Sequence, residues 1–219
     1  MRKFMCTLLV MMGLMCTNVY AADYKTDINN YTFDGQELIP EQFREQYVDT
    51  MQYLPNYYLD NFLKNGGVIK FVNTDLLEDE MVAGVNTYNP WDNTNVIQVK
   101  VNPEVVEDGM ENYIGCTIAK TLKHELGHYY DRHYTDKLSW ESRAELKKTA
   151  EYNKKYVNSC YNDKESFAEE FALMYSPVGD TLWGTNYSVP YDELERTIKK
   201  EMGIQDDTSR ITGGIINVY

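Results

Sequence analysis

Two histidines and a glutamate near the middle of the chain have the types and the spacing of a hydrolytic zinc site. His124, Glu125 and His128 stand in the run Lys-His-Glu-Leu-Gly-His over residues 123–128. On a helix, residues four apart lie about 40° apart around the axis and one turn along it, so two imidazoles can bind one zinc ion. Glu125 then comes beside the open coordination position, where it can take a proton from zinc-activated water. The pattern predicts His124 and His128 as metal ligands and Glu125 as a general base.

The remaining histidine of the chain, His133, is not expected to bind this metal. It lies about 180° around the helix from His124, within the apolar arc of the helical wheel. The extended metzincin pattern would also need a glycine and a histidine where this chain has Asp131 and Tyr134. We expect His133 to be packed and hydrogen-bonded in the core.

A catalytic zinc ion usually has three protein ligands, so a third must come from another segment. The best source is the run Tyr161–Ala172, in which Glu165 and Glu169 lie one helical turn apart. We expect Glu165 to bind the metal and Glu169 to accept the free N–H of a ligating histidine. The alternative is that Glu165 closes a capping box with Asn162 while Glu169 is solvated.

The sequence HELGH, followed by ESFAEEFALMYS, resembles the lethal-factor-like zinc metallopeptidases. These include the catalytic domain of anthrax lethal factor and the secreted Pro-Pro endopeptidases, and the likeness covers residues 120–176. The resemblance implies one zinc ion held by His124, His128 and Glu165, with Glu125 as base and Glu169 as a neighbour of the ligands. It implies a secreted metalloendopeptidase that hydrolyses peptide bonds in protein substrates. Cleavage between prolines is compatible with it, although no residue here encodes a proline-selective pocket.

Members of that family use a tyrosine ahead of the third-ligand glutamate to stabilise the oxyanion, and this chain departs from the pattern. The usual spacing falls on Asn158, whereas tyrosines stand at 156 and 161. A shortened loop would let Tyr161 serve, and Tyr156 is the alternative. A packing role for both tyrosines is also open.

An extended peptide substrate is expected to lie along an exposed strand edge, which satisfies its backbone whatever its side chains. The segment Val82–Asn86 is the expected edge, where Gly84 either permits close approach or marks a bulge. Trp91, in the following turn, is expected either to cover the substrate or to cap the core.

A second function from a different class is a catalytically silent binding protein on the same scaffold, with a purely structural zinc ion. The presence of Glu125 favours the enzyme, because a structural zinc site needs no base. A third possibility, a tyrosine-rich surface adhesin without metal, predicts no zinc by elemental analysis and no loss of thermal stability in a chelator.

The elements that must position these residues follow from the periodicity of apolar side chains. Helical patterns cover residues 41–64 with a break near Pro55, then 113–134, 138–157, 163–175 and 190–202. Strand patterns cover 68–72, 82–88 and 95–101, and residues 23–39 appear polar and irregular. We expect an α+β fold of zincin type: a small mixed sheet packed against the active-site helix, followed by a helical subdomain.

The first 21 residues have the pattern of a secretory signal peptide. Arg2 and Lys3 precede an apolar run from Phe4 to Met15, and small residues surround a cleavage point after Ala21. The run is shorter than the roughly 20 residues that span a bilayer. The sequence therefore predicts a secreted protein without a stable membrane anchor. One zinc metallopeptidase domain would cover 22–219, with a helix-and-sheet part to about 135 and a helical part over 136–219.

Composition limits the partners further. A length of 219 residues favours one domain, and a formal net charge of −13 excludes non-specific binding to nucleic acid, whose phosphates would be repelled. We expect a monomer. Loss of the signal peptide would leave Cys116 and Cys160, either as a disulfide or as two buried thiols. The 19 tyrosines suit a partly polar surface.

Overall fold

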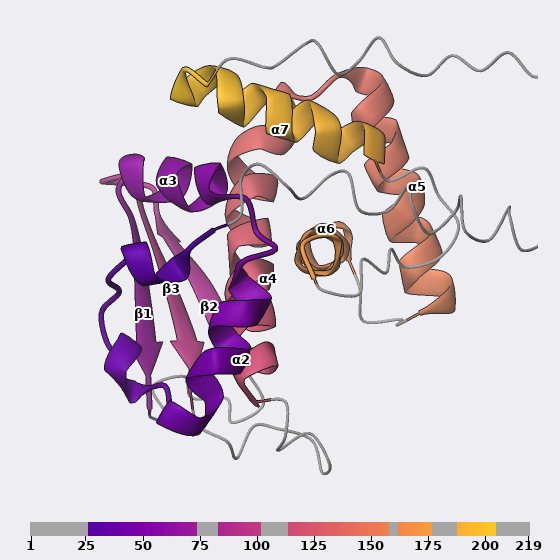
Figure 1. Ribbon diagram of the computed structural model, residues 1–219. Coiled ribbons are helices and arrows are strands. Elements are labelled where there is room, and N and C mark those ends of the chain that lie inside the picture. Colours follow the sequence, from indigo (N-terminus) through magenta and orange to yellow (C-terminus); the bar gives the residue numbers. More distant parts are fainter. Residues whose placement is uncertain (1–25, 74–82, 102–113, 158–161, 177–187, 205–219) are drawn as a thin grey trace, which may run out of the picture.

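The computed structural model describes residues 26–73, 83–101, 114–157, 162–176 and 188–204 (Figure 1). Short 3-10 turns η1 (Ile28–Asn30) and η2 (Gln36–Leu38) come first in the described chain. They are followed by α2 (Glu41–Met51), α3 (Asn56–Lys64), β1 (Gly67–Val72), β2 (Gly84–Asn89) and β3 (Thr94–Lys100). The remaining elements are α4 (Ile114–Tyr134), η5 (Thr135–Lys137), α5 (Trp140–Tyr156), α6 (Asp163–Met174) and α7 (Ser188–Met202). The predicted mixture of helices and strands is confirmed.

The described strands form a three-stranded mixed sheet in the order β1-β3-β2. β1 runs parallel to β3 from the pair Gly67–Asn95 onward, and β2 runs antiparallel to it from Gly84–Val99 onward. In β3, Ile97 and Val99 are fully buried while Val96 and Gln98 are partly exposed, but Lys100 at the end of the strand is buried as well. β2 stands at an edge of the sheet, so its outer backbone groups face away from β3.

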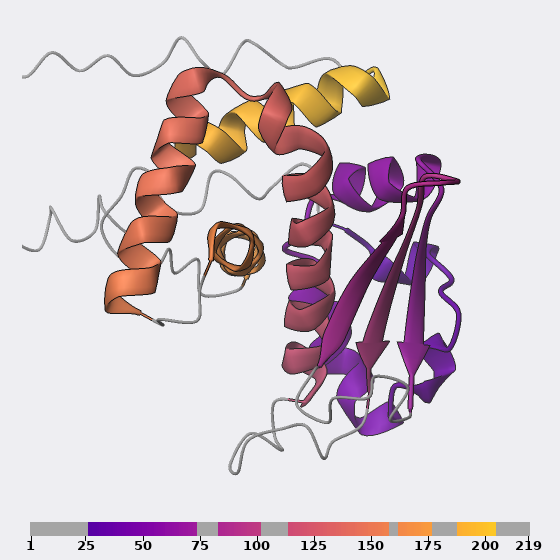
Figure 2. The ribbon, with the colours of Figure 1, turned by 180° about the vertical axis from the view of Figure 1, so that it is seen from behind.

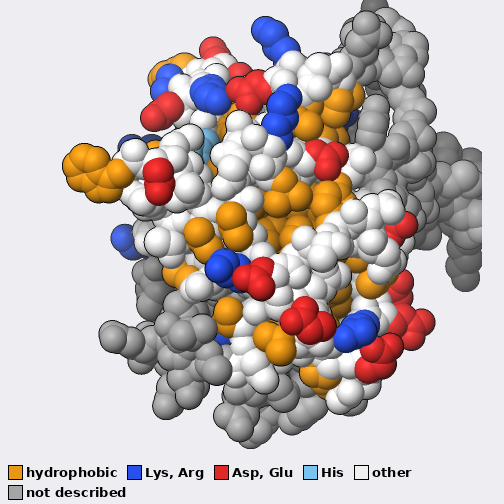
Figure 3. Space-filling view, turned by 90° about the vertical axis from the view of Figure 1, so that its left-hand side faces the viewer, with side chains coloured by type: hydrophobic (Ala, Val, Ile, Leu, Met, Phe, Trp, Pro, Cys, Tyr) orange, Lys and Arg blue, Asp and Glu red, His pale blue; other side chains and the backbone are white. Residues whose placement is uncertain are grey.

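Helix α4 is the central element of the described chain. In both ribbon views it runs between the sheet and α6, with α5 beyond α6 and α7 crossing one end (Figures 1 and 2). Its apolar stripe, including Leu122 and Leu126, is fully buried. On the face of the molecule where β1 and η2 lie, away from α4, Leu38 and Val68 are each 39% exposed. Figure 3 shows hydrophobic side chains gathered on that face.

Tyrosines contribute to the core more than to the surface, contrary to the expectation from composition. Tyr58 of α3 packs edge-to-face on Tyr130 of α4 and on Phe171 of α6, with ring centroids 5.0 and 5.1 Å apart. The hydroxyl of Tyr130 donates to the backbone oxygen of Tyr58, and the hydroxyls of Tyr58 and Tyr175 lie 2.6 Å apart. These hydroxyls can be buried because each finds a polar partner.

A buried lysine ties α4 to the elements on both sides of it. Lys123 is completely buried, and its ammonium group donates to the backbone oxygens of Thr50 (2.6 Å) and Tyr175. Burial lowers the pKa of Lys123 to about 7. The two carbonyls satisfy the donor, so the residue before His124 is held in place by α2 and by the end of α6.

Residues before α2, expected to be irregular, do form only short turns, but they belong to the core. Ile28 and Ile39 are buried, and the Phe71 backbone N–H of β1 donates to the Asp34 oxygen at 2.8 Å. This burial could not be predicted from the sequence, because the apolar side chains follow no helical or strand period.

Glycine at position 127 lets α4 and α6 approach closely at the level of the histidine motif. A Cβ atom there would lie 2.7 Å from Ala168 Cα and 3.1 Å from the Ala168 backbone oxygen. Gly127 immediately precedes His128, and Ala168 lies between Glu165 and Glu169. The absence of a side chain at Gly127 therefore allows the candidate ligands of the two helices to come close together.

Gly127→Ala is expected to destabilise the metal-free protein by about 1–3 kcal/mol, because backbone atoms of α6 would have to move. In an open helix the same change would stabilise by up to about 1 kcal/mol, so the sign is diagnostic. Urea unfolding with a chelator measures it. The exposed substitution Lys147→Ala on α5 serves as control, and a gain in stability for the Gly127 variant would contradict the tight contact.

Several predictions fall on residues outside the described part of the chain: the signal peptide over 1–21, Cys160 and Tyr161. Cys116 is half-buried and free of any disulfide. No helix in the described ranges is both long and apolar enough to cross a membrane.

Candidate metal centre

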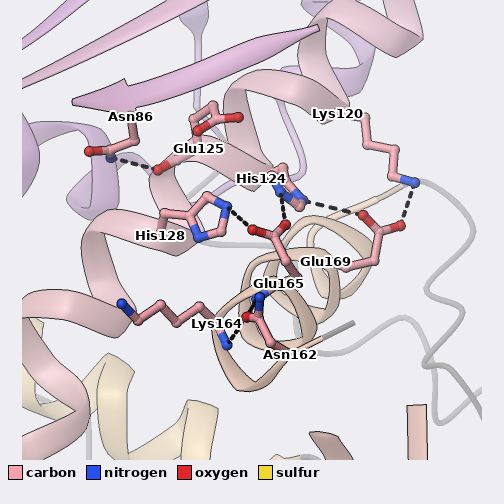
Figure 4. A network of polar contacts seen from close by, with 9 residues as sticks. All are labelled: Asn86, Lys120, His124, Glu125, His128, Asn162, Lys164, Glu165 and Glu169. Atoms are coloured by element: carbon pink, nitrogen blue, oxygen red, sulfur yellow. Dashed lines mark hydrogen bonds and ion pairs between the residues drawn. The ribbon is translucent and has the colours of Figure 1, made fainter. Parts of the chain in front are cut away.

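Three side chains from two helices converge in a geometry that could hold a metal ion (Figure 4). Nε2 of His124 lies 3.3 Å from one carboxylate oxygen of Glu165, and Nε2 of His128 lies 3.5 Å from the other. One ligand atom from each residue falls within 4.8 Å of the others. A tetrahedral ion with bonds of about 2.1 Å separates its ligand atoms by about 3.4 Å, so the spacing fits one small cation.

The local sequence explains how each helix presents its ligands. His124 and His128 stand one turn apart on α4, and their rings meet edge-to-face with centroids 4.8 Å apart. Asn162 directly precedes α6, and its side chain accepts from the backbone N–H groups of Lys164 and Glu165, both at 3.0 Å. Asn162 therefore caps the helix, as the capping alternative required, but the Glu165 carboxylate is directed at the histidines (Figure 4).

Glu169 holds the other side of the His124 ring. Its Oε2 lies 3.3 Å from His124 Nδ1, and its Oε1 accepts from Lys120 at 2.5 Å. Burial alone would raise the pKa of Glu169, but hydrogen bonds from His124 and Lys120 outweigh it and lower the pKa to about 2. A charged Glu169 that accepts from Nδ1–H leaves Nε2 of His124 free to bind a cation.

Glu125 lies between the histidines and strand β2 (Figure 4) and is only 5% exposed. Burial raises the pKa of its carboxyl group to about 7, although the nearby His124 charge acts in the opposite direction. Asn86 of β2 donates to the Glu125 backbone oxygen at 2.9 Å. A carboxyl group with a pKa near neutrality can both accept and return a proton, as a general base must.

These residues line a cleft of about 720 Å³. The β2 edge from Ala83 to Asn86 forms one wall, α4 contributes residues between Thr117 and Arg132, and the start of α6 forms the other wall. In the described part of the chain, the cleft thus brings an edge strand, two imidazoles and three carboxylates together. No family model and no curated protein matches this chain.

Gly84 does not mark a bulge, but it does permit a close approach, in this structure to α4. The pairing of β2 with β3 runs through Gly84–Val99 without a bulge. A Cβ atom at Gly84 would lie 2.6 Å from Thr121 Cγ2 and 3.1 Å from Cγ and Oε1 of Glu125. The glycine is needed because β2 packs directly on α4, and this packing places the strand edge beside Glu125.

The two aromatic candidates inside the described residues lie away from the cleft. Trp91, at the tip of the β2–β3 hairpin, is 94% exposed, so it neither covers the cleft nor caps the core. Tyr156 is 62% exposed at the end of α5, where its ring packs on Tyr152 with centroids 4.8 Å apart. The oxyanion role of Tyr161 stays a prediction, because that residue lies outside the described ranges.

His133 is half-buried and outside the metal group, as expected. Its ring packs between Tyr88 and Tyr129, with centroids 5.3 and 4.6 Å away, and Nε2 lies 3.4 Å from Asn95 Oδ1. The predicted packing and a polar partner are thus found, but His133 is only half-buried and lies at the border of the core.

Sequence reasoning missed Lys120, Arg132 and Asn86. Helical spacing could have found the first two, since they stand four residues before His124 and four after His128. Nothing local marks Asn86, because its partners are in α4, far along the chain.

In the metal-free protein, part of the stability should disappear at alkaline pH. Burial would lower the pKa of His124, but hydrogen bonds to Glu165 and Glu169 outweigh it and raise the pKa to about 9. Protonated His124 therefore stabilises the fold fully below its unfolded pKa of about 6.5, and this contribution of up to roughly 3 kcal/mol is lost as pH rises through 9.

Urea unfolding of chelator-treated protein between pH 6 and 10 measures this loss. Glu169→Gln removes one of the two carboxylate partners and should flatten the profile in that window. An unchanged profile in the variant would show that Glu169 does not hold the imidazolium.

Proposed function

We propose that the protein is a zinc-dependent metalloendopeptidase with a zincin-like active site. The observation that carries this proposal is the meeting of His124 and His128 with Glu165 around a space suited to one small cation, in the cleft that also contains Glu125. Two imidazoles and one carboxylate are a donor set typical of catalytic zinc, which keeps a coordination position open. The resemblance of residues 120–176 to lethal-factor-like metallopeptidases points to the same chemistry.

The residues of the chain divide the work of peptide hydrolysis between them. When bound, zinc would polarise the scissile carbonyl and lower the pKa of water toward about 7. Glu125, whose side chain lines the cleft beside the histidines, accepts the proton of the attacking water and returns it to the leaving amine. Glu169 fixes the orientation of the His124 ring. Tyr161 is the proposed donor to the oxyanion.

Substrate binding is proposed along the outer edge of β2. Ala83 to Asn86 line the cleft, and among the described strands β2 pairs with β3 alone, so its other side can accept an extended peptide. Hydrogen bonds from the strand would hold the peptide backbone next to Glu125. A protein substrate, secretion and a monomeric state belong to the same proposal.

The test uses the chain without its predicted signal peptide, loaded with zinc. Elemental analysis should give one zinc ion per chain, and mass spectrometry should find cleaved products in a randomised peptide library. One zinc ion without cleavage would support the silent binding protein instead. Absence of bound metal after dialysis against zinc would overturn both.

A further inference from the structure

We infer that Arg132 and Lys164 bind a carboxylate of the substrate on the His128 side of the cleft, so that the proposed peptidase acts on acidic peptides. The inference rests on the proposed function, because it names the substrate class of the same site. Both side chains line the cleft, and they come from the two helices that carry the candidate metal ligands.

Arg132 stands one turn after His128 and is held in a fixed position. Its Nη1 donates to Asn86 Oδ1 at 3.1 Å and to Asn95 Oδ1 at 3.2 Å, and its guanidinium lies over the Tyr88 ring at 5.2 Å. Neither Nε nor Nη2 has an acceptor among the described residues. A planar guanidinium that is already oriented, with donors to spare, is well suited to bind a carboxylate.

Lys164 supplies the second positive charge from the first turn of α6. Its side chain extends from the helix on the side of the site where His128 lies (Figure 4). In the described part of the chain no carboxylate comes within ion-pair distance of its ammonium group. The charges of Arg132 and Lys164 both act electrostatically on the His128 ring, so the two cations lie near the same imidazole.

Asp131 is a carboxylate that could compete for these cations. It interacts electrostatically with both cations, but it forms no described ion pair with either, and its Oδ1 accepts from Thr135 at 2.8 Å. Asp131 is half-buried and is not part of the cleft wall. Arg132 and Lys164 are therefore left to interact with a ligand.

The charge along the cleft is uneven. Lys120, at the opposite end, is paired with Glu169 at 2.5 Å. Among the described residues, three cationic side chains and three carboxylates line the cleft, so a bound divalent ion would leave an excess of positive charge on this part of its lining. The chain as a whole has a net charge of −13. A positive cleft in an acidic protein attracts acidic peptides to this site and to few others on the surface.

The test compares acetylated and amidated peptides that differ only by Asp or Asn at one position, placed in turn on each side of the cleaved bond. The zinc-loaded protein should cleave the Asp peptide about tenfold more efficiently at one position, mainly through a lower KM. Neutral peptides ending in a free carboxylate or an amide form a parallel arm. That arm distinguishes a side-chain carboxylate from a terminal one.

Lys164→Glu should abolish the preference for Asp and create one for Lys at the same position. Glutamate is favourable near the start of a helix, so α6 should still form. Lys147→Glu on exposed α5 makes the same change in net charge and should leave the Asp/Asn ratio unchanged. Arg132→Gln should reduce the ratio.

The inference would be overturned if Asp and Asn peptides were cleaved equally at every position and a terminal carboxylate gave no preference. An unchanged Asp/Asn cleavage ratio in Lys164→Glu would overturn it as well. If no peptide is cleaved, the proposed function fails, and binding decides the inference. Fluorescence anisotropy with zinc-loaded Glu125→Gln protein and the same peptide pairs should then give about tenfold tighter binding of the acidic peptide, lost in the double variant with Lys164→Glu. Equal binding would refute it.

Discussion

Glu125→Gln is expected to lower kcat/KM for any cleaved peptide by about 10²–10⁴-fold while the metal content stays the same. Glutamine has nearly the same shape and keeps the side chain in the narrow space beside Gly84, but it cannot accept a proton. His124, His128 and Glu165 are untouched, so the ligand set for the metal remains complete. The measurement pairs steady-state kinetics with elemental analysis of the same sample.

The control for this substitution is Glu151→Gln, the same chemical change at an exposed position of α5. It should retain full activity. A Glu125 variant that keeps both zinc and wild-type cleavage would refute the role of general base. A variant that loses zinc as well would mean that Glu125 supports the metal rather than the proton transfer.

Glu165→Ala should remove the contribution of α6 to the metal centre and with it both zinc and activity. In the wild type, zinc at 100 times its Kd should stabilise the fold by about 2.7 kcal/mol, because the ion binds the folded chain. The variant should lose this zinc-dependent rise in Tm, since only the two histidines of α4 remain. Thermal unfolding with and without a chelator measures the difference.

Two other substitutions in α6 should affect zinc binding less than Glu165→Ala does. Glu169→Gln leaves the three ligands in place and should weaken zinc binding by only about 10–100-fold. Asp163→Ala, at an exposed position in the same helix, should leave the zinc-dependent stabilisation intact. If Glu165→Ala bound zinc as tightly as the wild type, the third ligand would have to be sought elsewhere.

The helices that carry the site could be predicted because their signals are local. The apolar stripe and four-residue spacing of residues 113–134 predict α4, found over Ile114–Tyr134. Asn162 and the apolar residues after it predict α6, found over Asp163–Met174. Most element boundaries agree within two residues, since caps, glycines and periodicity act over one or two turns.

The contacts that join those helices could not be predicted in the same way. In two places a glycine meets a segment that is distant in the sequence: Gly127 packs against Ala168, and Gly84 packs against Thr121. Asn86, which contacts both Glu125 and Arg132, looks like any polar strand residue until the strand is packed on α4. The periodicity of a sequence does not indicate which residues from distant segments will become neighbours.

The sequence by itself determined which chemical groups the chain offers and the helical faces on which they stand. His124, Glu125 and His128 are grouped by the pitch of a single helix, which depends on local hydrogen bonds alone. Only the tertiary structure decided that Glu165 meets both imidazoles, that the β2 edge lies beside Glu125, and that Trp91 points into solvent. Those outcomes depend on how closely whole elements can pack. Two glycines allow the close approach: Gly127 meets the backbone of α6, and Gly84 meets side chains of α4.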